Sequence, residues 1–116
     1  MPANPPRMKD VPRNLKGYFL CLLRKGPRWN ETNDSPALML QHLAYLRTQL
    51  EARKFLVAGP VVDGLDDLVG VTILEAGSAA EALELANQDP GAVAGRLRME
   101  VRPVFLPSLD AVRVEY

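Results

Sequence analysis

The clearest candidate for acid–base chemistry in this sequence of 116 residues is its single histidine, His42. An imidazole titrates near neutral pH, so it can take up and return a proton during a reaction. At 100° per residue, His42 lies about 60° from the apolar stripe of the helix predicted around it. We therefore place it on the border of the buried side, where an imidazole is partly desolvated and can still meet a ligand. The alternative is a helix histidine that merely forms a hydrogen bond.

Four further side chains have a chemical and a structural interpretation each. Tyr45, one helical turn after His42, is either a second proton donor or a half-buried packing residue. Trp29 stands in the polar segment RKGPRWNETNDS, where it is either a lid over an aromatic ligand or a contact between subunits. Arg98 and Arg102 either bind a carboxylate or belong to a solvated strand edge.

Several kinds of site are missing from the sequence. There is no phosphate-binding loop, no nucleophile elbow and no zinc-type spacing, so we expect neither a metal nor a cofactor. Asp63, Asp66 and Asp67 match a cation-binding loop only loosely. The single Cys21 lies in an apolar run, where we expect an inert thiol without a disulfide partner.

Composition and charge narrow the class of protein. Lys plus Arg equals Asp plus Glu at 14 each, so no net charge attracts nucleic acid or an anionic membrane, and we expect neither partner. No apolar segment approaches the ~20 residues that cross a bilayer. A lone cysteine suits a reducing compartment, and we predict a cytoplasmic protein. The expected organisation is a Pro-rich arm over residues 1–15, one folded domain over 16–105 and a tail over 106–116.

The pattern of apolar residues predicts six elements. Their expected ranges are strand 18–23, helix 36–53 with Ser35 as N-cap, strand 55–58, strand 69–75, a second helix from the Ser78 capping box to Asp89-Pro90, and strand 97–105. The core stripe predicted for the first helix is Met39, Leu43, Leu46 and Leu50. For the second helix it is Ala79, Ala82, Leu83 and Ala86, whose small side chains indicate close packing on the sheet.

This order predicts an α+β fold of the ferredoxin-like βαββαβ type, with a four-stranded antiparallel sheet and the first and third strands at its centre. Two helices cover one face of such a sheet. The runs at 18–23 and 69–75 are apolar on both faces, so the second face also needs a cover. We expect a second copy of the chain to supply it, in a homodimer or a larger homo-oligomer.

The sequence also resembles a known family. The segments QHLAYL (41–46), FLVAGP (55–60), Gly70-Val71, Asp89-Pro90 and EVRP (100–103) are similar in order and spacing to YCII-related proteins, over about residues 17–105. The resemblance implies a dimeric α+β barrel and a catalytic His and Asp pair at His42 and Asp89. One branch of the family removes halide from chlorinated hydroquinones. The chain departs from the family pattern at Gly91, which replaces a bulky aromatic residue.

Two functions follow as expectations. The first is a small cofactor-independent enzyme in which His42 and Asp89 perform isomerase, lyase or dehalogenase-like chemistry on a small molecule such as an aromatic or lactone-like compound. We expect Trp29, Tyr45, Gly59 and Pro60 to bind the substrate. The second is a ligand-binding or interaction module that uses the same dimeric barrel without turnover. Asp89 before Pro90 also has a purely structural interpretation, as the cap of a helix.

Overall fold

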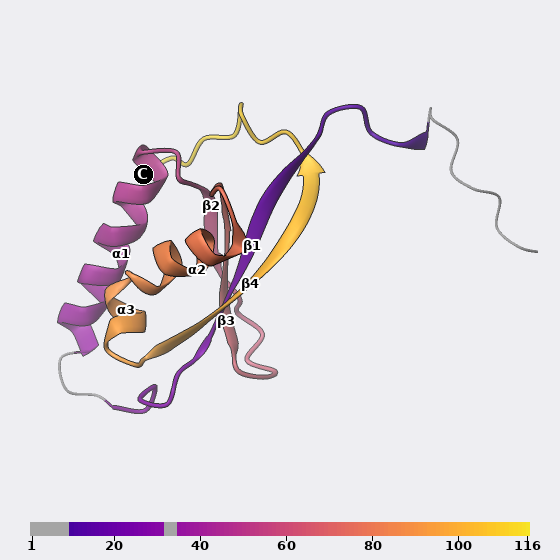
Figure 1. Cartoon of the computed structure of the whole chain (residues 1–116). Coiled ribbons are helices and arrows are strands. Elements are labelled where there is room, and N and C mark those ends of the chain that lie inside the picture. Colours follow the sequence, from indigo (N-terminus) through magenta and orange to yellow (C-terminus); the bar gives the residue numbers. More distant parts are fainter. Residues whose placement is uncertain (1–9, 32–34) are drawn as a thin grey trace, which may run out of the picture.

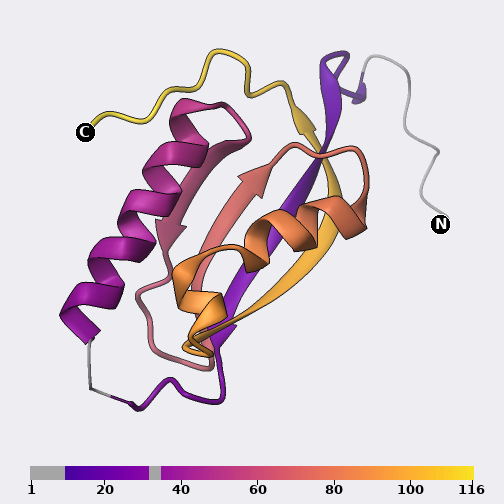
Figure 2. The same ribbon diagram turned by 60° about the vertical axis from the view of Figure 1, so that its left-hand side comes forward.

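The computed structural model describes residues 10–31 and 35–116, so most of the predicted N-terminal arm lies outside the described residues. The elements in chain order are β1 (Leu15–Lys25), α1 (Ser35–Glu51), β2 (Phe55–Pro60), β3 (Leu68–Leu74), α2 (Ala79–Asn87), α3 (Pro90–Val93) and β4 (Leu97–Pro107). Helices α1 and α2 lie on the same face of the sheet (Figures 1 and 2). None of the described helices has both the length and the apolar character needed to cross a membrane.

The four strands form one antiparallel sheet in the order β2-β3-β1-β4. This is the predicted ferredoxin-like arrangement, with the first and third strands at the centre. The ladder between β1 and β4 runs from Leu15 opposite Pro107 to Lys25 opposite Leu97, which is longer than the predicted strands. Backbone pairing does not require apolar side chains, so the apolar pattern underestimates the length of both strands.

Helix α2 begins at the predicted capping box and lies close against the sheet. The Ser78 hydroxyl accepts a hydrogen bond from the Glu81 N–H at 3.1 Å, and the Glu81 carboxylate accepts one from the Gly77 N–H at 2.8 Å. Ala82 and Ala86 are 0% and 3% exposed. The predicted stripe is wrong at its other two positions, because Ala79 and Leu83 are exposed. The contact with the sheet is therefore narrower than the helical wheel indicated.

The hydrophobic core lies between α2 and the sheet. Its buried residues are Cys21, Leu23, Phe55, Leu74, Ala82 and Ala86. Burial raises the pKa of the Cys21 thiol to about 11, and the negative charge of Asp89 adds to this effect. The thiol therefore stays protonated at neutral pH, as expected for an inert cysteine.

Helix α1 differs from the prediction, because no residue in it is buried. Leu46 and Leu50 pack against the core, as the stripe predicted. Met39 and Leu43, at the N-terminal end of the same stripe, remain 56% and 52% exposed. The helical wheel correctly predicted which side of α1 faces the sheet. The N-terminal half of α1 nevertheless stands away from the sheet and leaves a space beneath it.

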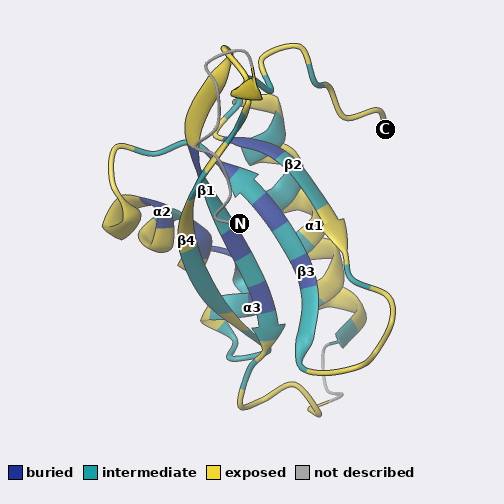
Figure 3. Ribbon diagram, turned by 90° about the vertical axis from the view of Figure 1, so that its right-hand side faces the viewer, coloured by how far each residue is buried: buried dark blue, intermediate teal, exposed yellow. Residues whose placement is uncertain are grey.

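The second face of the sheet points away from both helices (Figure 3). Alternation along β1 and the strand register put five half-buried apolar residues on this face: Leu20, Leu22, Val57, Val71 and Ile73. Beside them, Arg24 contacts Asp67 at 2.7 Å and Glu100 at 3.3 Å. Arg98 contacts Asp67 at 3.2 Å, and Arg102 contacts Glu100 at 3.6 Å. These ion pairs favour the interpretation of the two arginines as a solvated strand edge over a site that binds the carboxylate of a ligand.

The segment after β4 folds back towards the C-terminal end of α1 (Figures 1 and 2). The Arg53 guanidinium donates hydrogen bonds to the carbonyls of Leu109, Asp110 and Val112, at 3.1, 3.3 and 2.8 Å. The backbone N–H of Leu109 donates to the Tyr18 hydroxyl at 2.7 Å. The predicted tail is thus held against the domain through its backbone carbonyls and the N–H of Leu109.

Candidate active site

The structure brings His42 and Asp89 together within one chain. His42 comes from the middle of α1, and Asp89 comes from the turn between α2 and α3. The distance between His42 Nδ1 and Asp89 Oδ2 is 2.6 Å, a short and charge-assisted hydrogen bond. The Asp89 side chain is 2% exposed and the His42 side chain is 17% exposed. The carboxylate is therefore sealed inside the protein, while the imidazole keeps an open edge.

The position of Asp89 follows from how the chain leaves α2. Asp89 is the N-cap of α3, with Pro90 in the first turn, and its Oδ1 accepts a hydrogen bond from the Gly91 N–H at 2.8 Å. One carboxylate oxygen caps the short helix and the other contacts the imidazole. The cap interpretation and the pair interpretation of Asp89 are therefore compatible, since each uses a different oxygen.

The contact fixes the tautomer of the imidazole. A buried carboxylate accepts hydrogen bonds, so Nδ1 is the ring nitrogen that carries the proton and donates. The other nitrogen, Nε2, then holds a lone pair that can accept a proton or a hydrogen bond. This is the arrangement of a general base whose orientation is set by a carboxylate.

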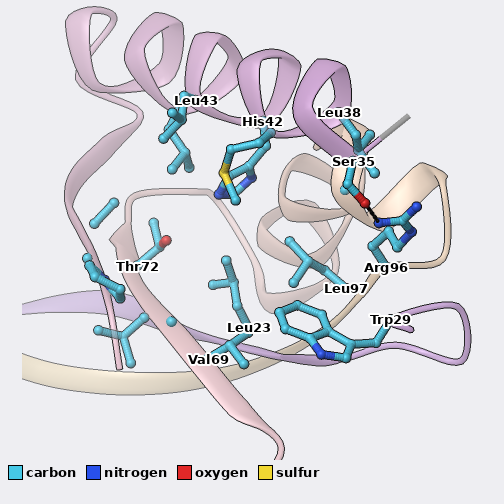
Figure 4. A pocket seen from close by; sticks show the side chains of 18 of the residues that line it. Leu23, Trp29, Ser35, Leu38, His42, Leu43, Val69, Thr72, Arg96 and Leu97 are labelled. Atoms are coloured by element: carbon cyan, nitrogen blue, oxygen red, sulfur yellow. Dashed lines mark hydrogen bonds between the residues drawn. The ribbon is translucent and has the colours of Figure 1, made fainter. Parts of the chain in front are cut away.

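His42 lines a cavity of about 680 Å³ between α1, the sheet and the loop that follows β1. Figure 4 shows His42 projecting into this space from α1, with Leu23 and Val69 on the opposite side. The lining is predominantly apolar: Leu23, Leu38, Met39, Leu43, Leu46, Ala58, Pro60, Val69 and Leu97 contribute to it. Met39 and Leu43, which the prediction assigned to the core, belong to this wall.

Three of the four predicted substrate-binding residues line the cavity: Trp29, Gly59 and Pro60. The Trp29 ring is 38% exposed, and the Lys25 ammonium lies 5.6 Å from its centroid. A Cβ added at Gly59 would meet no atom within 4 Å, so this residue leaves the sheet edge of the cavity open.

The fourth, Tyr45, is not among the residues that line the cavity, so its contact with substrate stays a prediction. Its hydroxyl donates to the Leu85 carbonyl of α2 at 2.5 Å, and its ring packs edge-on against Phe55 with centroids 6.0 Å apart. Burial raises the pKa of Tyr45 to about 12, with a contribution from the Asp89 charge. The Tyr45 side chain therefore joins α1 to α2 and β2.

One end of the cavity holds a polar pair that the sequence did not reveal (Figure 4). Ser35 begins α1, where the prediction had it as the N-cap, and its hydroxyl donates to the Glu31 carbonyl at 3.2 Å. The same oxygen accepts from Arg96 at 2.8 Å (Figure 4). Arg96 follows Gly95, whose φ of 76° turns the chain after α3. The glycine at position 95 was the signal available in the sequence, but the approach of Arg96 to Ser35 depends on the tertiary fold.

Thr72 also lines the cavity and was not predicted, whereas Gly91, which the sequence singled out as a departure from the family pattern, is part of the same lining. Thr72 is the one polar residue in the run LVGVTIL, and that mismatch was visible in the sequence. A Cβ added at Gly91 would come within 2.7 Å of Leu97 Cδ1, so Gly91 permits the close approach of α3 to Leu97. Among the described residues, no three His, Cys, Asp or Glu side chains come together to hold a metal.

A model of the YCII-related domain matches residues 18–106. The chain belongs to the YCII-related family. No curated protein matches the sequence significantly. Among solved structures, the chain is similar to the 5-chloro-2-hydroxyhydroquinone dehydrochlorinase TftG from Burkholderia phenoliruptrix AC1100, in complex with 2,5-dihydroxybenzoquinone. The two share 28% identity with a TM-score of 0.54, over 73% of this chain and 90% of that chain.

The family match confirms the resemblance drawn from the sequence. The similarity to TftG extends over nearly all of that enzyme, which acts on a small ring compound and is bound to another. The family match and this structural similarity together support a small enzyme-like function.

Proposed function

We propose that this chain is a small enzyme in which His42, oriented by Asp89, moves protons on a small ring compound without a cofactor. The observation that carries the proposal is the 2.6 Å contact between His42 Nδ1 and Asp89 Oδ2 at the wall of a cavity of about 680 Å³. Ligand pockets commonly measure about 300–1,000 Å³, and one substituted ring fits well within this one. The apolar walls suit the faces of such a ring, and the His42 Nε2 atom suits an acidic hydroxyl on its edge.

Removal of HCl from a chlorinated hydroquinone needs acid–base steps only. The His42 Nε2 atom takes a proton from one ring hydroxyl and delivers it to the carbon that carries chlorine, which gives a keto form. It then takes a proton from a second hydroxyl while chloride leaves with the electron pair of the C–Cl bond. The product is a hydroxyquinone, and no oxidant or reductant enters. Asp89 stabilises the imidazolium formed in each step. Isomerase and lyase reactions use the same proton transfers.

A homodimer in a dimeric α+β barrel is part of the proposal. Its support is the sheet face with Leu20, Leu22, Val57, Val71 and Ile73, which no described element of this chain covers (Figure 3). The ion pairs of Arg24 with Asp67 and Glu100 give this face a rim with both signs of charge, which a second copy can complement. Sedimentation equilibrium should give twice 12.8 kDa, and a monomer at micromolar concentration would contradict the dimer. The single buried Cys21 suits a reducing compartment such as the cytoplasm.

The test uses 5-chloro-2-hydroxyhydroquinone under anaerobic conditions, with chloride release measured by ion chromatography. His42→Ala and Asp89→Asn should each lower the rate by about 10²–10⁴-fold. Asparagine is also a good N-cap, so Asp89→Asn retains the cap of α3 and removes the acceptor charge. The matched control is Gln41→Ala, at the exposed neighbour of His42 on α1, which should leave the rate unchanged.

A second measurement does not depend on the leaving group. In D₂O, the ring protons of 2,5-dihydroxybenzoquinone should exchange faster with the wild-type protein than with His42→Ala, as followed by NMR. Imidazole ¹⁵N shifts should report protonated Nδ1 in the wild type and a mixture of tautomers in Asp89→Asn. Binding of this compound by calorimetry, with neither exchange nor chloride release, would favour the non-catalytic binding module.

A further inference from the structure

Thr72 is a polar residue in a position that the fold would otherwise fill with an apolar one. It lies in the middle of β3, opposite Cys21 of β1 and Ala58 of β2, on the face of the sheet that carries the helices. Its neighbours along β3 are Val71 and Ile73. Thr72 is 2% exposed, so its hydroxyl has lost nearly all contact with bulk water.

The hydroxyl of Thr72 has no partner among the described residues. The hydrogen bonds and ion pairs of this part of the chain do not include Thr72 Oγ1, and the oxygen is not sealed in the packed interior either. Thr72 lines the cavity, and Figure 4 shows its oxygen on the side that faces this space. A buried hydroxyl without a partner costs folding free energy, which a ligand atom in the cavity can recover.

The surroundings of Thr72 keep room for such an atom. Two residues earlier on the same face of β3 is Gly70, where a Cβ would come within 3.5 Å of Leu23 Cδ2 and 3.3 Å of the Gly59 carbonyl. Any side chain at Gly70 would press on this part of the cavity floor. Ala58, the partner of Thr72 on β2, also lines the cavity and is apolar. A polar atom of a ligand at this end would find the Thr72 hydroxyl as its side-chain partner.

Figure 4 places Thr72 and the Arg96–Ser35 pair at opposite ends of the cavity, with His42 between them. We infer that Thr72 is a ligand-binding residue, and that the substrate is a ring with oxygen substituents on more than one side. One substituent meets His42 Nε2 and another meets the Thr72 hydroxyl. A threonine hydroxyl donates to a quinone oxygen and accepts from a phenol, so it suits a hydroxyquinone and a hydroquinone alike. This inference rests on the proposed function for the location of the substrate.

The substitution that isolates the hydroxyl is Thr72→Val, which keeps the branched shape of the side chain. Thr72→Ser is the rescue variant, because it keeps the hydroxyl and loses a methyl group. The matched control is Thr48→Val, at an exposed position on α1 where the hydroxyl donates to the Ala44 carbonyl at 3.0 Å. All four proteins are compared with 2,5-dihydroxybenzoquinone, hydroquinone and phenol by calorimetry.

We expect Thr72→Val to bind 2,5-dihydroxybenzoquinone and hydroquinone roughly tenfold more weakly, the effect of one lost hydrogen bond. Phenol has a single oxygen, which His42 takes, so its affinity should be the same in both proteins. Thr72→Ser should stay within about threefold of the wild type, and Thr48→Val should equal it. Equal affinities of wild type and Thr72→Val for all three compounds would overturn the inference, as would a wild type that binds none of them.

The thermal stability of the free protein provides a second test, which needs no ligand. An unpartnered hydroxyl predicts that Thr72→Val has the same Tm as the wild type or a higher one. A lower Tm would mean that the hydroxyl has a structural partner, and would overturn the inference. The proposed chemistry fails separately: if His42→Ala leaves turnover and proton exchange unchanged while Thr72→Val still weakens binding, Thr72 keeps its role and His42 loses its own.

Discussion

The two longer helices, α1 and α2, lie on the same face of the sheet, but only α2 packs closely against it. Helix α2 presses Ala82 and Ala86 onto the strands and leaves them 0% and 3% exposed. Helix α1 has no buried residue, although Met39 and Leu43 point to the sheet side. Small side chains let one helix approach closely, and the other stands on larger side chains with a cavity beneath its N-terminal half.

The difference between the two helices separates the packed core from the candidate site. The packed core lies under α2, and the cavity lies under α1. Two hydrogen bonds join the regions: His42 to Asp89 at 2.6 Å, and Tyr45 to the Leu85 carbonyl at 2.5 Å. The imidazole is therefore held from the rigid side of the molecule while it faces the open side. A general base benefits from this placement, because its orientation does not depend on the cavity being filled.

The largest expected effect comes from enlarging a residue under α2. Ala82→Leu should destabilise the fold by about 3 kcal/mol, because the close contact with the sheet has no room for three more carbons. Leu43→Ala, on the cavity side of α1, should cost about 0.5 kcal/mol, since the side chain is 52% exposed. Urea denaturation measures both. Similar losses for the two variants would mean that α1 packs as tightly as α2.

The second largest effect is a loss of folding stability at alkaline pH, caused by the Cys21 thiol in the core. Burial raises the pKa of Cys21 from 9.0 to about 11 in the folded protein. Between these values the unfolded chain has lost the thiol proton and the folded protein keeps it, so stability falls as pH rises. The slope for this group is about 1.4 kcal/mol per pH unit between pH 9 and 11, and its contribution is complete below pH 9. Cys21→Ala should flatten that part of the profile, and an unchanged slope would show that another group controls it.

A smaller effect is expected from Tyr45→Phe, which removes the hydroxyl that joins α1 to the Leu85 carbonyl. The loss should be about 1 kcal/mol, with faster amide exchange in α1. Tyr116→Phe is the control, because Tyr116 is 66% exposed. Substrate KM should not change in Tyr45→Phe, since the side chain does not line the cavity. A raised KM with unchanged stability would restore the substrate contact that the sequence suggested.

Local patterns were sufficient to predict the architecture. Strand order follows from which runs are apolar on both faces, and the start of α2 follows from Ser78 and Glu81. The pairing of His42 with Asp89 came from the family resemblance, because 47 residues separate them and no spacing rule connects a mid-helix position to a turn. A helical wheel gives the direction of a side chain and not its distance from the sheet. Met39 and Leu43 were therefore assigned to a core where there is a cavity.

The chain reversal after α1 constrains how this protein can be engineered. Arg53 has a φ of 61°, a backbone conformation for which a designer would ordinarily substitute glycine. The same residue holds the carbonyls of Leu109, Asp110 and Val112, so glycine there would relax the backbone and release the C-terminal segment. Asparagine, which tolerates this conformation, is too short to span the same three carbonyls. A substitution at Arg53 that relaxes the backbone therefore also removes the hydrogen bonds that hold the C-terminal segment. An engineer has to choose between the two effects.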